Sequence, residues 1–282
     1  MLIKKSLEFI LFGSIFIAAC AVSFCMETNI LLGAPLNSFS FYCFVFGATL
    51  VQYNLHYLVK KVAFRNSERL DWSRKNKKTH LVLLMIGCML ILFSFFSFHL
   101  HHFMILIGLG CIAFLYSFPF LPFGKKKRIK EYGFLKIITL SLLWTLVTVW
   151  FPVNDMEVDT SLFIFVFVKR FIFMFVLCLL FDMRDIEIDD KEKINTLAVI
   201  LGSRKSYRLS YLLLLLFVVL SLAQYLYLPQ AGFLAAMLIS ALFTFVTVEF
   251  TKKYNSDFIY LAGIDGMMIL QAILVYVFTL KL

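Results

Sequence analysis

The fold class of this chain is decided by the stretch Ser161-Leu-Phe-Ile-Phe-Val-Phe-Val-Lys-Arg-Phe-Ile-Phe-Met-Phe-Val-Leu-Cys-Leu-Leu-Phe181. Apart from Ser161, Lys169 and Arg170, every residue in it is apolar. A helix of roughly 20 apolar residues is long enough to cross the hydrocarbon core of a bilayer. Lipid offers no other partner to backbone polar groups, so such a segment must be helical. The stretch therefore predicts a transmembrane helix.

Further apolar runs of similar length lie on both sides of this stretch, and nine spans are predicted in all. They are Leu7–Met26, Ser38–Val59, His80–Phe98, Phe103–Phe120, Phe134–Phe151, Ser161–Phe181, Tyr207–Leu228, Ala231–Phe250 and Phe258–Leu280. Only 16% of the residues are charged, whereas soluble domains carry about a quarter. We expect an all-α integral membrane protein in which residues 1–282 form a single polytopic transmembrane domain.

Most of the 27 Lys and Arg residues fall in alternate loops. Lys4 and Lys5 precede the first span, and larger basic groups lie within 60–78, 125–136 and 184–208. Because basic residues flanking the spans mark the cytoplasmic side, we expect a cytoplasmic N-terminus and a C-terminus outside. The net charge of +10 thus belongs to membrane flanks, and no nucleic-acid partner is expected.

The segment that follows the sixth span carries the strongest signal of chemistry. It reads Asp182-Met-Arg-Asp-Ile-Glu-Ile-Asp-Asp190, and the i, i+3, i+7 spacing of Asp182, Asp185 and Asp189 would place three carboxylates on one helix face. Like charges there repel unless a cation neutralises them. Carboxylates of this kind suit Mg²⁺, which bridges them to substrate phosphates. The alternative is a solvated acidic helix end, balanced by Arg184 and nearby lysines.

The run Asp182–Gly202 resembles the second aspartate motif of the UbiA prenyltransferase superfamily. That motif reads DxxDxxxD, followed by a basic segment and by Thr-Leu-x-x-x-x-Gly, and Asp185 and Asp189 match its core pair. A second likeness is Leu115-Tyr-Ser-Phe-Pro119 with the basic run Lys125-Lys-Lys-Arg128, which is similar to the family's Tyr-Ser-x-Pro and the loop after its fourth span. Together with the nine-span plan, the resemblance covers nearly the whole chain.

The resemblance implies a nine-helix UbiA-like bundle with a central lipid-accessible cavity. The implied activity is transfer of an isoprenyl group from a prenyl diphosphate to a small acceptor, which can be aromatic, at the cytoplasmic face. Mg²⁺ is the implied cofactor, with Asp182, Asp185 and Asp189 as its ligands and with Asp185 and Asp189 as the catalytic pair. The candidate substrate-binding residues are Asn54, Tyr57, Lys126, Lys127, Arg128 and Arg184. Family habit places such a protein in a bacterial inner membrane, surrounded by lipid.

The family's first motif, NDxxDxxxD, is degenerate in this chain. The matching stretch is Asn54-Leu-His-Tyr-Leu-Val-Lys-Lys-Val62, in which Leu55, Leu58 and Val62 stand in place of three aspartates. Lys60 and Lys61 could hold a diphosphate as point charges, although flanking lysines more often only mark the cytoplasmic side. A non-catalytic relative that binds an isoprenoid or a lipid is therefore the alternative function. A transporter is disfavoured, because matched Gly or Pro interruptions are not evident in mid-span.

Two groups of ionisable residues lie deep inside predicted spans. Lys169 and Arg170 fall in the sixth span, and Asp265 falls in the ninth. Ionisable side chains at this depth are costly and usually have a partner. We expect one of the two bases to pair with Asp265 across the bundle. Such a pair either fixes helix register or contributes to a substrate site.

Overall fold

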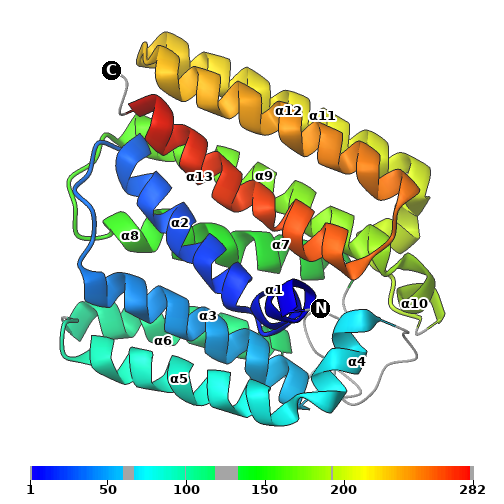
Figure 1. Cartoon of the computed structure of the whole chain (residues 1–282). Helices are drawn as coiled ribbons and strands as arrows, with labels where there is room; N and C mark the ends of the chain where they lie inside the picture. The colour runs from blue at the N-terminus through cyan, green and yellow to red at the C-terminus, as the bar shows by residue number, and fades with distance from the viewer. Residues whose placement is uncertain (1, 60–66, 99, 118–132, 192, 280–282) are drawn as a thin grey trace.

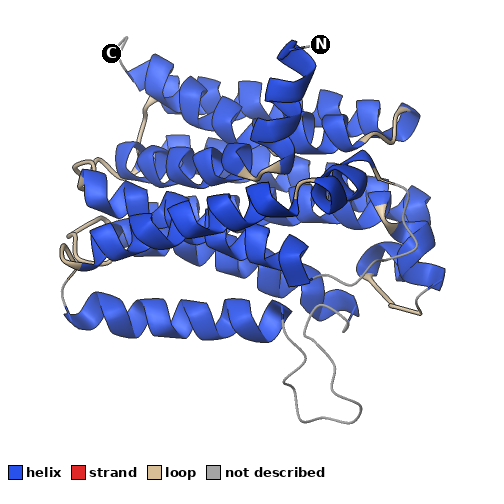
Figure 2. Ribbon diagram, turned by 60° about the horizontal axis from the view of Figure 1, so that its bottom comes forward, coloured by secondary structure: helices blue, strands red, loops and turns tan. Residues whose placement is uncertain are grey.

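The structure is a computed structural model that describes residues 2–59, 67–98, 100–117, 133–191 and 193–279. Its elements are helices joined by loops (Figures 1 and 2), and the described residues contain no strand. The helices are α1 (Leu2–Phe12), α2 (Ile15–Leu31), α3 (Phe39–Val59), α4 (Glu68–Lys75), α5 (Lys77–Phe95), α6 (Leu100–Ser117), α7 (Gly133–Thr145), the π-helix η2 (Leu146–Trp150), α8 (Phe151–Val153), α9 (Thr160–Arg184), α10 (Ile186–Lys191), α11 (Leu197–Tyr227), α12 (Ala231–Lys253), the π-helix η3 (Ile259–Ile264) and α13 (Gly266–Thr279).

In its described residues, each predicted span coincides with one or more of these helices. Six segments in the described part are long and apolar enough to cross a membrane, and the bent pair α1–α2 would make a seventh. The helices α3 and α6 coincide with the predicted second and fourth spans, but they do not meet the same criteria of length and hydropathy. The all-helical class and the integral membrane location are confirmed. The count of nine spans stays a prediction.

The helix α9 lies at the centre of the bundle. In its most apolar window 67% of the residues are buried inside the protein, against 22% for α5. It packs against α7 and α11, while α2 packs against α13 and α3. On the side of the bundle away from α11 and α12, α3 packs against α5 (Figure 1). These two helices approach closely because Gly47 and Gly87 have no side chains at the contact. A Cβ atom at Gly47 would lie only 2.7 Å from the Gly87 carbonyl oxygen.

The predicted first span is not one straight helix. The chain bends by 61° between α1 and α2, because Ser14 adopts a left-handed conformation with φ of 68°. Two side chains from other helices support the break. The Asn54 amide donates to the Gly13 carbonyl over 3.2 Å, and the Arg69 guanidinium donates to Ser14 Oγ over 3.0 Å. A break inside a membrane helix is tolerated when neighbouring side chains satisfy the freed groups in this way.

Gly133, the first residue of α7, touches the segment before α11. Its φ is +27°, and a Cβ atom there would lie 1.8 Å from the Asn195 carbonyl oxygen. We expect Gly133→Ala to lower the free energy of unfolding by about 1–3 kcal/mol, since overpacked backbone must shift. Chemical denaturation in a neutral detergent measures this loss. Gly110→Ala is the matched control, because a Cβ at Gly110 meets no atom within 4 Å; equal effects of the two changes would contradict the prediction.

Candidate functional site

The acidic segment does not form one continuous helix. The helix α9 ends at Arg184, Asp185 caps it, and α10 begins at Ile186. The prediction of three carboxylates on one helix face is therefore wrong in its geometry. Tertiary contacts nevertheless keep two of the three carboxylates together, because Asp182 and Asp189 bind the same cation.

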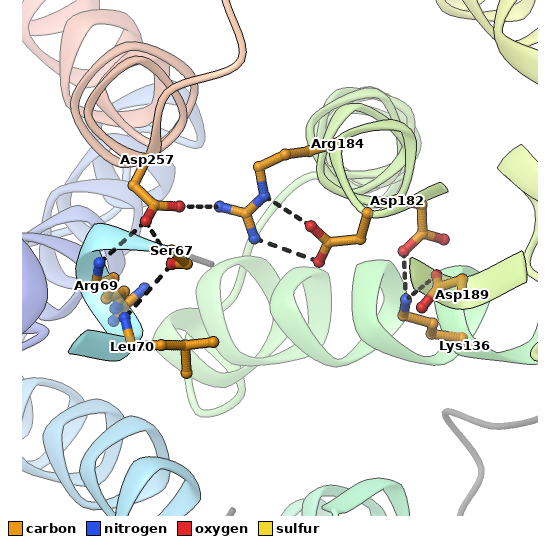
Figure 3. A network of polar contacts seen from close by, with 9 residues as sticks. Ser67, Arg69, Leu70, Lys136, Asp182, Arg184, Asp189 and Asp257 are labelled. Carbon is orange, nitrogen blue, oxygen red and sulfur yellow. Dashed lines mark hydrogen bonds and ion pairs between the residues drawn. The ribbon is translucent and has the colours of Figure 1, made fainter. Parts of the chain in front are cut away.

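That cation is Lys136, which lies one turn inside α7 (Figure 3). Its Nζ atom is 2.6 Å from Asp182 Oδ1 and 3.4 Å from Asp189 Oδ2. Burial raises the pKa of the Asp189 carboxyl, and the Lys136 charge opposes that shift. Sequence reasoning treated Lys136 as an ordinary basic flank. Its place inside the predicted fifth span, where ionisable residues usually have a function, was the signal that could have identified it.

The third carboxylate, Asp185, pairs with its neighbour Arg184. The guanidinium makes two contacts with this carboxylate, Nε to Oδ1 at 2.9 Å and Nη2 to Oδ2 at 3.4 Å, a bidentate arrangement that fixes both groups. Its Nη1 atom also lies 3.4 Å from Asp257 Oδ1 (Figure 3). We call Asp182, Asp185, Asp189, Lys136 and Arg184 the aspartate cluster.

Asp257, just before η3, connects the aspartate cluster to α4. Its Oδ2 atom accepts hydrogen bonds from the Ser67 hydroxyl and, over 3.0 Å, from the Arg69 backbone N–H. Arg184 binds the other oxygen of the same carboxylate (Figure 3). Sequence reasoning missed Asp257 and Arg69. Neither residue lies in a recognisable motif, so no local pattern indicated them.

Two predicted substrate-binding residues, Asn54 and Tyr57, lie at the end of α3. Asn54 is fully buried; its amide donates to the carbonyls of Gly13 and Leu50, and its Oδ1 atom lies 2.6 Å from His80 Nδ1. Tyr57 stacks on the His80 ring. These contacts use both side chains in helix packing, and a substrate role for them stays a prediction.

Arg69 is a cation that lies beside this end of α3. Its guanidinium is 4.4 Å from the centre of the Tyr57 ring, and the residue is only 7% exposed. Its Nε atom is buried and has no hydrogen-bond partner among the described residues. A buried arginine therefore lies beside the stretch in which the family carries carboxylates. The predicted Lys126, Lys127 and Arg128, and the alternative pair Lys60 and Lys61, lie outside the described residues.

The aspartate cluster offers one free ligand for a cation. Asp182 Oδ2 is buried and has no hydrogen-bond partner in the described part of the chain, although a buried carboxylate oxygen normally has one. Carboxylate oxygens are the ligands that Mg²⁺ prefers, so this oxygen fits the implied cofactor. In this structure, however, Lys136 and Arg184 are the counter-ions of the three aspartates. The described residues include no group of three or more His, Cys, Asp or Glu that could hold a metal ion.

The deep ionisable residues do not pair as predicted. Arg170 Nη2 lies 3.1 Å from Glu27 Oε2, and both side chains are almost completely buried. Glu27 follows the predicted first span, Leu7–Met26, but α2 continues through it to Leu31. Asp265 instead lies within electrostatic range of Arg69 and Arg184. The expected pairing of Asp265 with a base of the sixth span is therefore wrong.

Glu27 and Arg170 belong to a polar network that joins α2, α9, α13 and η2. Glu27 Oε1 accepts a hydrogen bond of 3.0 Å from the Gln271 amide. Arg170 donates to the Phe24 carbonyl and to Thr148 Oγ1, and its guanidinium lies 3.6 Å from the centre of the Phe24 ring. The network explains how two opposite charges are accommodated in the interior of the bundle.

Comparison with known proteins assigns the fold and the family. The structure is similar to a UbiA homologue from Archaeoglobus fulgidus bound to GPP and Mg²⁺, with a TM-score of 0.65, 12% identity and coverage of 95% of this chain and 99% of the other. A structure reported for digeranylgeranylglyceryl phosphate synthase gives a TM-score of 0.57 at 16% identity and covers 99% of each chain. An apo UbiA homologue from Aeropyrum pernix K1 gives 0.57 at 12% identity, covering 94% and 97%.

At such identities these similarities establish the fold alone. No curated protein sequence matches the chain. The sequence model of the UbiA prenyltransferase family matches residues 61–260, which is well over half of the chain. The resemblance carried by the second aspartate motif is thereby confirmed, and the chain belongs to the UbiA prenyltransferase family.

Proposed function

We propose that this chain transfers an isoprenyl group from a prenyl diphosphate to a small acceptor, with Mg²⁺ at the aspartate cluster. The observation that carries the proposal is the free Asp182 oxygen, buried beside a lysine that already holds two aspartates of the second motif. Family membership supports the same activity. So do the related structures that hold GPP or DMAPP together with Mg²⁺.

Different residues at this site would hold the cation and contact the diphosphate. Asp182, Asp185 and Asp189 would hold the cation, and Lys136 keeps Asp182 and Asp189 in place. Arg184, anchored by Asp185 and Asp257, would contact the diphosphate, as would Lys126, Lys127 and Arg128. When bound, Mg²⁺ supplies positive charge that stabilises the departing diphosphate. Apolar helices around the site would exclude water from the allylic carbon as the C–O bond breaks.

The location of the site follows from the distribution of basic residues. Lys136 and the segment after α9 belong to the basic-rich side of the bundle, which would face the cytoplasm. The N-terminus would then be cytoplasmic and the C-terminus outside, in a bacterial inner membrane. A central cavity open to lipid would admit the isoprenoid chain, as the family resemblance implies.

A second candidate function is binding of an isoprenoid or a lipid without catalysis. The observation that favours it is the end of α3, where Leu55 and Leu58 replace the carboxylates of the first motif. Asn54 and Tyr57, the polar residues of the same turn, are engaged in packing with His80. A protein with half of the metal ligands could retain a binding site and lose turnover.

Release of inorganic pyrophosphate distinguishes the two functions. Purified protein in detergent is incubated with prenyl diphosphates of increasing length and with a panel of small acceptors, aromatic ones included, in Mg²⁺ or in EDTA. Prenyl transfer predicts pyrophosphate and a prenylated acceptor, both dependent on Mg²⁺. Binding of a prenyl diphosphate without release under any of these conditions would support the non-catalytic function and contradict the proposal.

A further inference from the structure

Lys169 lies in α9 at a distance from the aspartate cluster. It precedes Asp182 by 13 residues, or about 20 Å along the helix axis. The residue is only 3% exposed. A lysine buried this deeply in a membrane helix is costly unless it has a partner. The proposed prenyl transfer makes no use of it.

Among the described residues, Lys169 has no carboxylate partner of its own. Glu27, a carboxylate that acts on it electrostatically, is already paired with Arg170 and hydrogen-bonded to Gln271. Within the described part of the chain, Lys169 has no ion pair or hydrogen bond, and its closest interaction is with the Phe217 ring, 5.8 Å from Nζ. Two buried basic side chains, Lys169 and Arg170, therefore lie near one carboxylate, and only Arg170 is paired with it.

A small pocket lies beside Lys169, formed by residues of α11, α12 and the turn between them. Its polar lining includes Lys169, Gln224 and Gln230. Gln224 Oε1 and Gln230 Oε1 are buried and have no hydrogen-bond partner among the residues that the structure describes. The pocket is partly open, and its volume of about 10 Å³ has room for a single water-sized group. The pocket thus combines an unpartnered ammonium with two unsatisfied amides.

We propose that this partly open pocket binds one oxygen atom of an oxyanion, the phosphate or carboxylate end of a membrane amphiphile or of a free anion, while the rest of the group lies outside it. The ammonium of Lys169 supplies the charge. Rotation of the amides by 180°, which exchanges their oxygen and nitrogen atoms, lets Gln224 and Gln230 donate N–H groups to the same oxygen. An anion would also stabilise the charged form of Lys169, which a water molecule would not do, so the combination of an amine and two amides favours an anion.

Thermal unfolding in a neutral detergent tests the proposal. Phosphatidylglycerol is added in mixed micelles and compared with phosphatidylcholine, and sodium phosphate is compared with sodium chloride at equal ionic strength. We expect an anion-specific rise in Tm of a few degrees, as for any ligand that binds only the folded state. A response to phosphatidylglycerol alone identifies a lipid headgroup as the source, and an equal response to phosphate identifies a free anion.

Three variants assign the response to the pocket. Lys169→Gln removes the charge and should abolish the rise, whereas Lys253→Gln, an exposed lysine at the far end of α12, should keep it. Gln224→Glu places a carboxylate beside Lys169, so it should raise the Tm without any ligand and reduce the response. This variant also tests the proposal if Lys169→Gln fails to fold.

Three results would overturn the proposal. The first is the absence of any anion-specific rise in the wild-type protein. The second is a full response in Lys169→Gln. The third is a full response in Gln224→Glu, because a built-in carboxylate must compete with the anion. Each result leaves the proposed prenyl transfer untouched, since the aspartate cluster lies in a different part of the fold.

Discussion

Replacing Asp189 by Asn is expected to lower prenyl diphosphate turnover by a factor of about 100 or more, the cost of losing one electrostatic group at a reacting centre. Asp189 is 8% exposed and is held by Lys136. The amide cannot supply the negative charge that a cation requires, and it leaves Lys136 with Asp182 alone. Initial rates of pyrophosphate release at saturating Mg²⁺ measure the effect.

The neighbouring Asp190 supplies the matched control. It is exposed and lies on the same short helix, so Asp190→Asn changes the net charge equally without touching Lys136. We expect its turnover to stay within about twofold of the wild type, as is usual for surface substitutions. Similar losses in the two variants would mean that the acidic segment acts only through its overall charge, against the role assigned to Asp189.

Replacing Glu27 by Leu is expected to lower the free energy of unfolding by about 3–5 kcal/mol, the typical cost of leaving one member of a buried ion pair alone. Arg170 would keep its contacts with Thr148 and the Phe24 carbonyl, but no carboxylate would neutralise it. Denaturation in detergent, followed by helix content, measures the loss.

The double variant Glu27→Leu/Arg170→Met tests whether the Glu27–Arg170 ion pair affects stability without affecting catalysis at the aspartate cluster. Because both charges are then removed, most of the stability lost in Glu27→Leu should return. Catalysis should be nearly unaffected, since Arg170 lies about half the length of α9, or roughly 18 Å by helical rise, from Asp182. A double variant that is less stable than Glu27→Leu would contradict the assignment of Glu27 as the partner of Arg170.

The hydropathy of the sequence predicted the helices well, because each apolar run carries its own evidence for a span. The sixth span, predicted as Ser161–Phe181, is α9 at Thr160–Arg184. The second aspartate motif was equally local, since a contiguous run of residues carries the family resemblance that the family comparison confirms.

The sequence could not predict contacts between residues distant in the chain. Lys136 and Asp189 are separated by 53 residues, and Glu27 and Gln271 by 244. Nothing near Asp257 in the sequence indicates that its carboxylate joins Ser67, Arg69 and Arg184. The partners of buried charges are chosen by helix packing, and hydropathy alone does not determine that packing.

The positions of the helix breaks could not be predicted from the hydrophobic pattern of the sequence either. Ser14 has a left-handed backbone conformation that is uncommon for a residue other than glycine. The break becomes tolerable only through Asn54 and Arg69, which come from other helices. The spacing of Asp182, Asp185 and Asp189 predicted one continuous helix, but α9 ends at Arg184 and the middle aspartate caps it.

The second aspartate motif is proposed to form a Mg²⁺-dependent diphosphate site. The most direct test measures the Tm of the purified protein during titration with GPP, with and without Mg²⁺. The wild type is compared with Asp185→Asn and Asp190→Asn. We predict stabilisation that requires Mg²⁺, is lost in Asp185→Asn and is kept in Asp190→Asn. Equal stabilisation without Mg²⁺, or full stabilisation of Asp185→Asn, would contradict the claim and place the diphosphate on basic side chains instead.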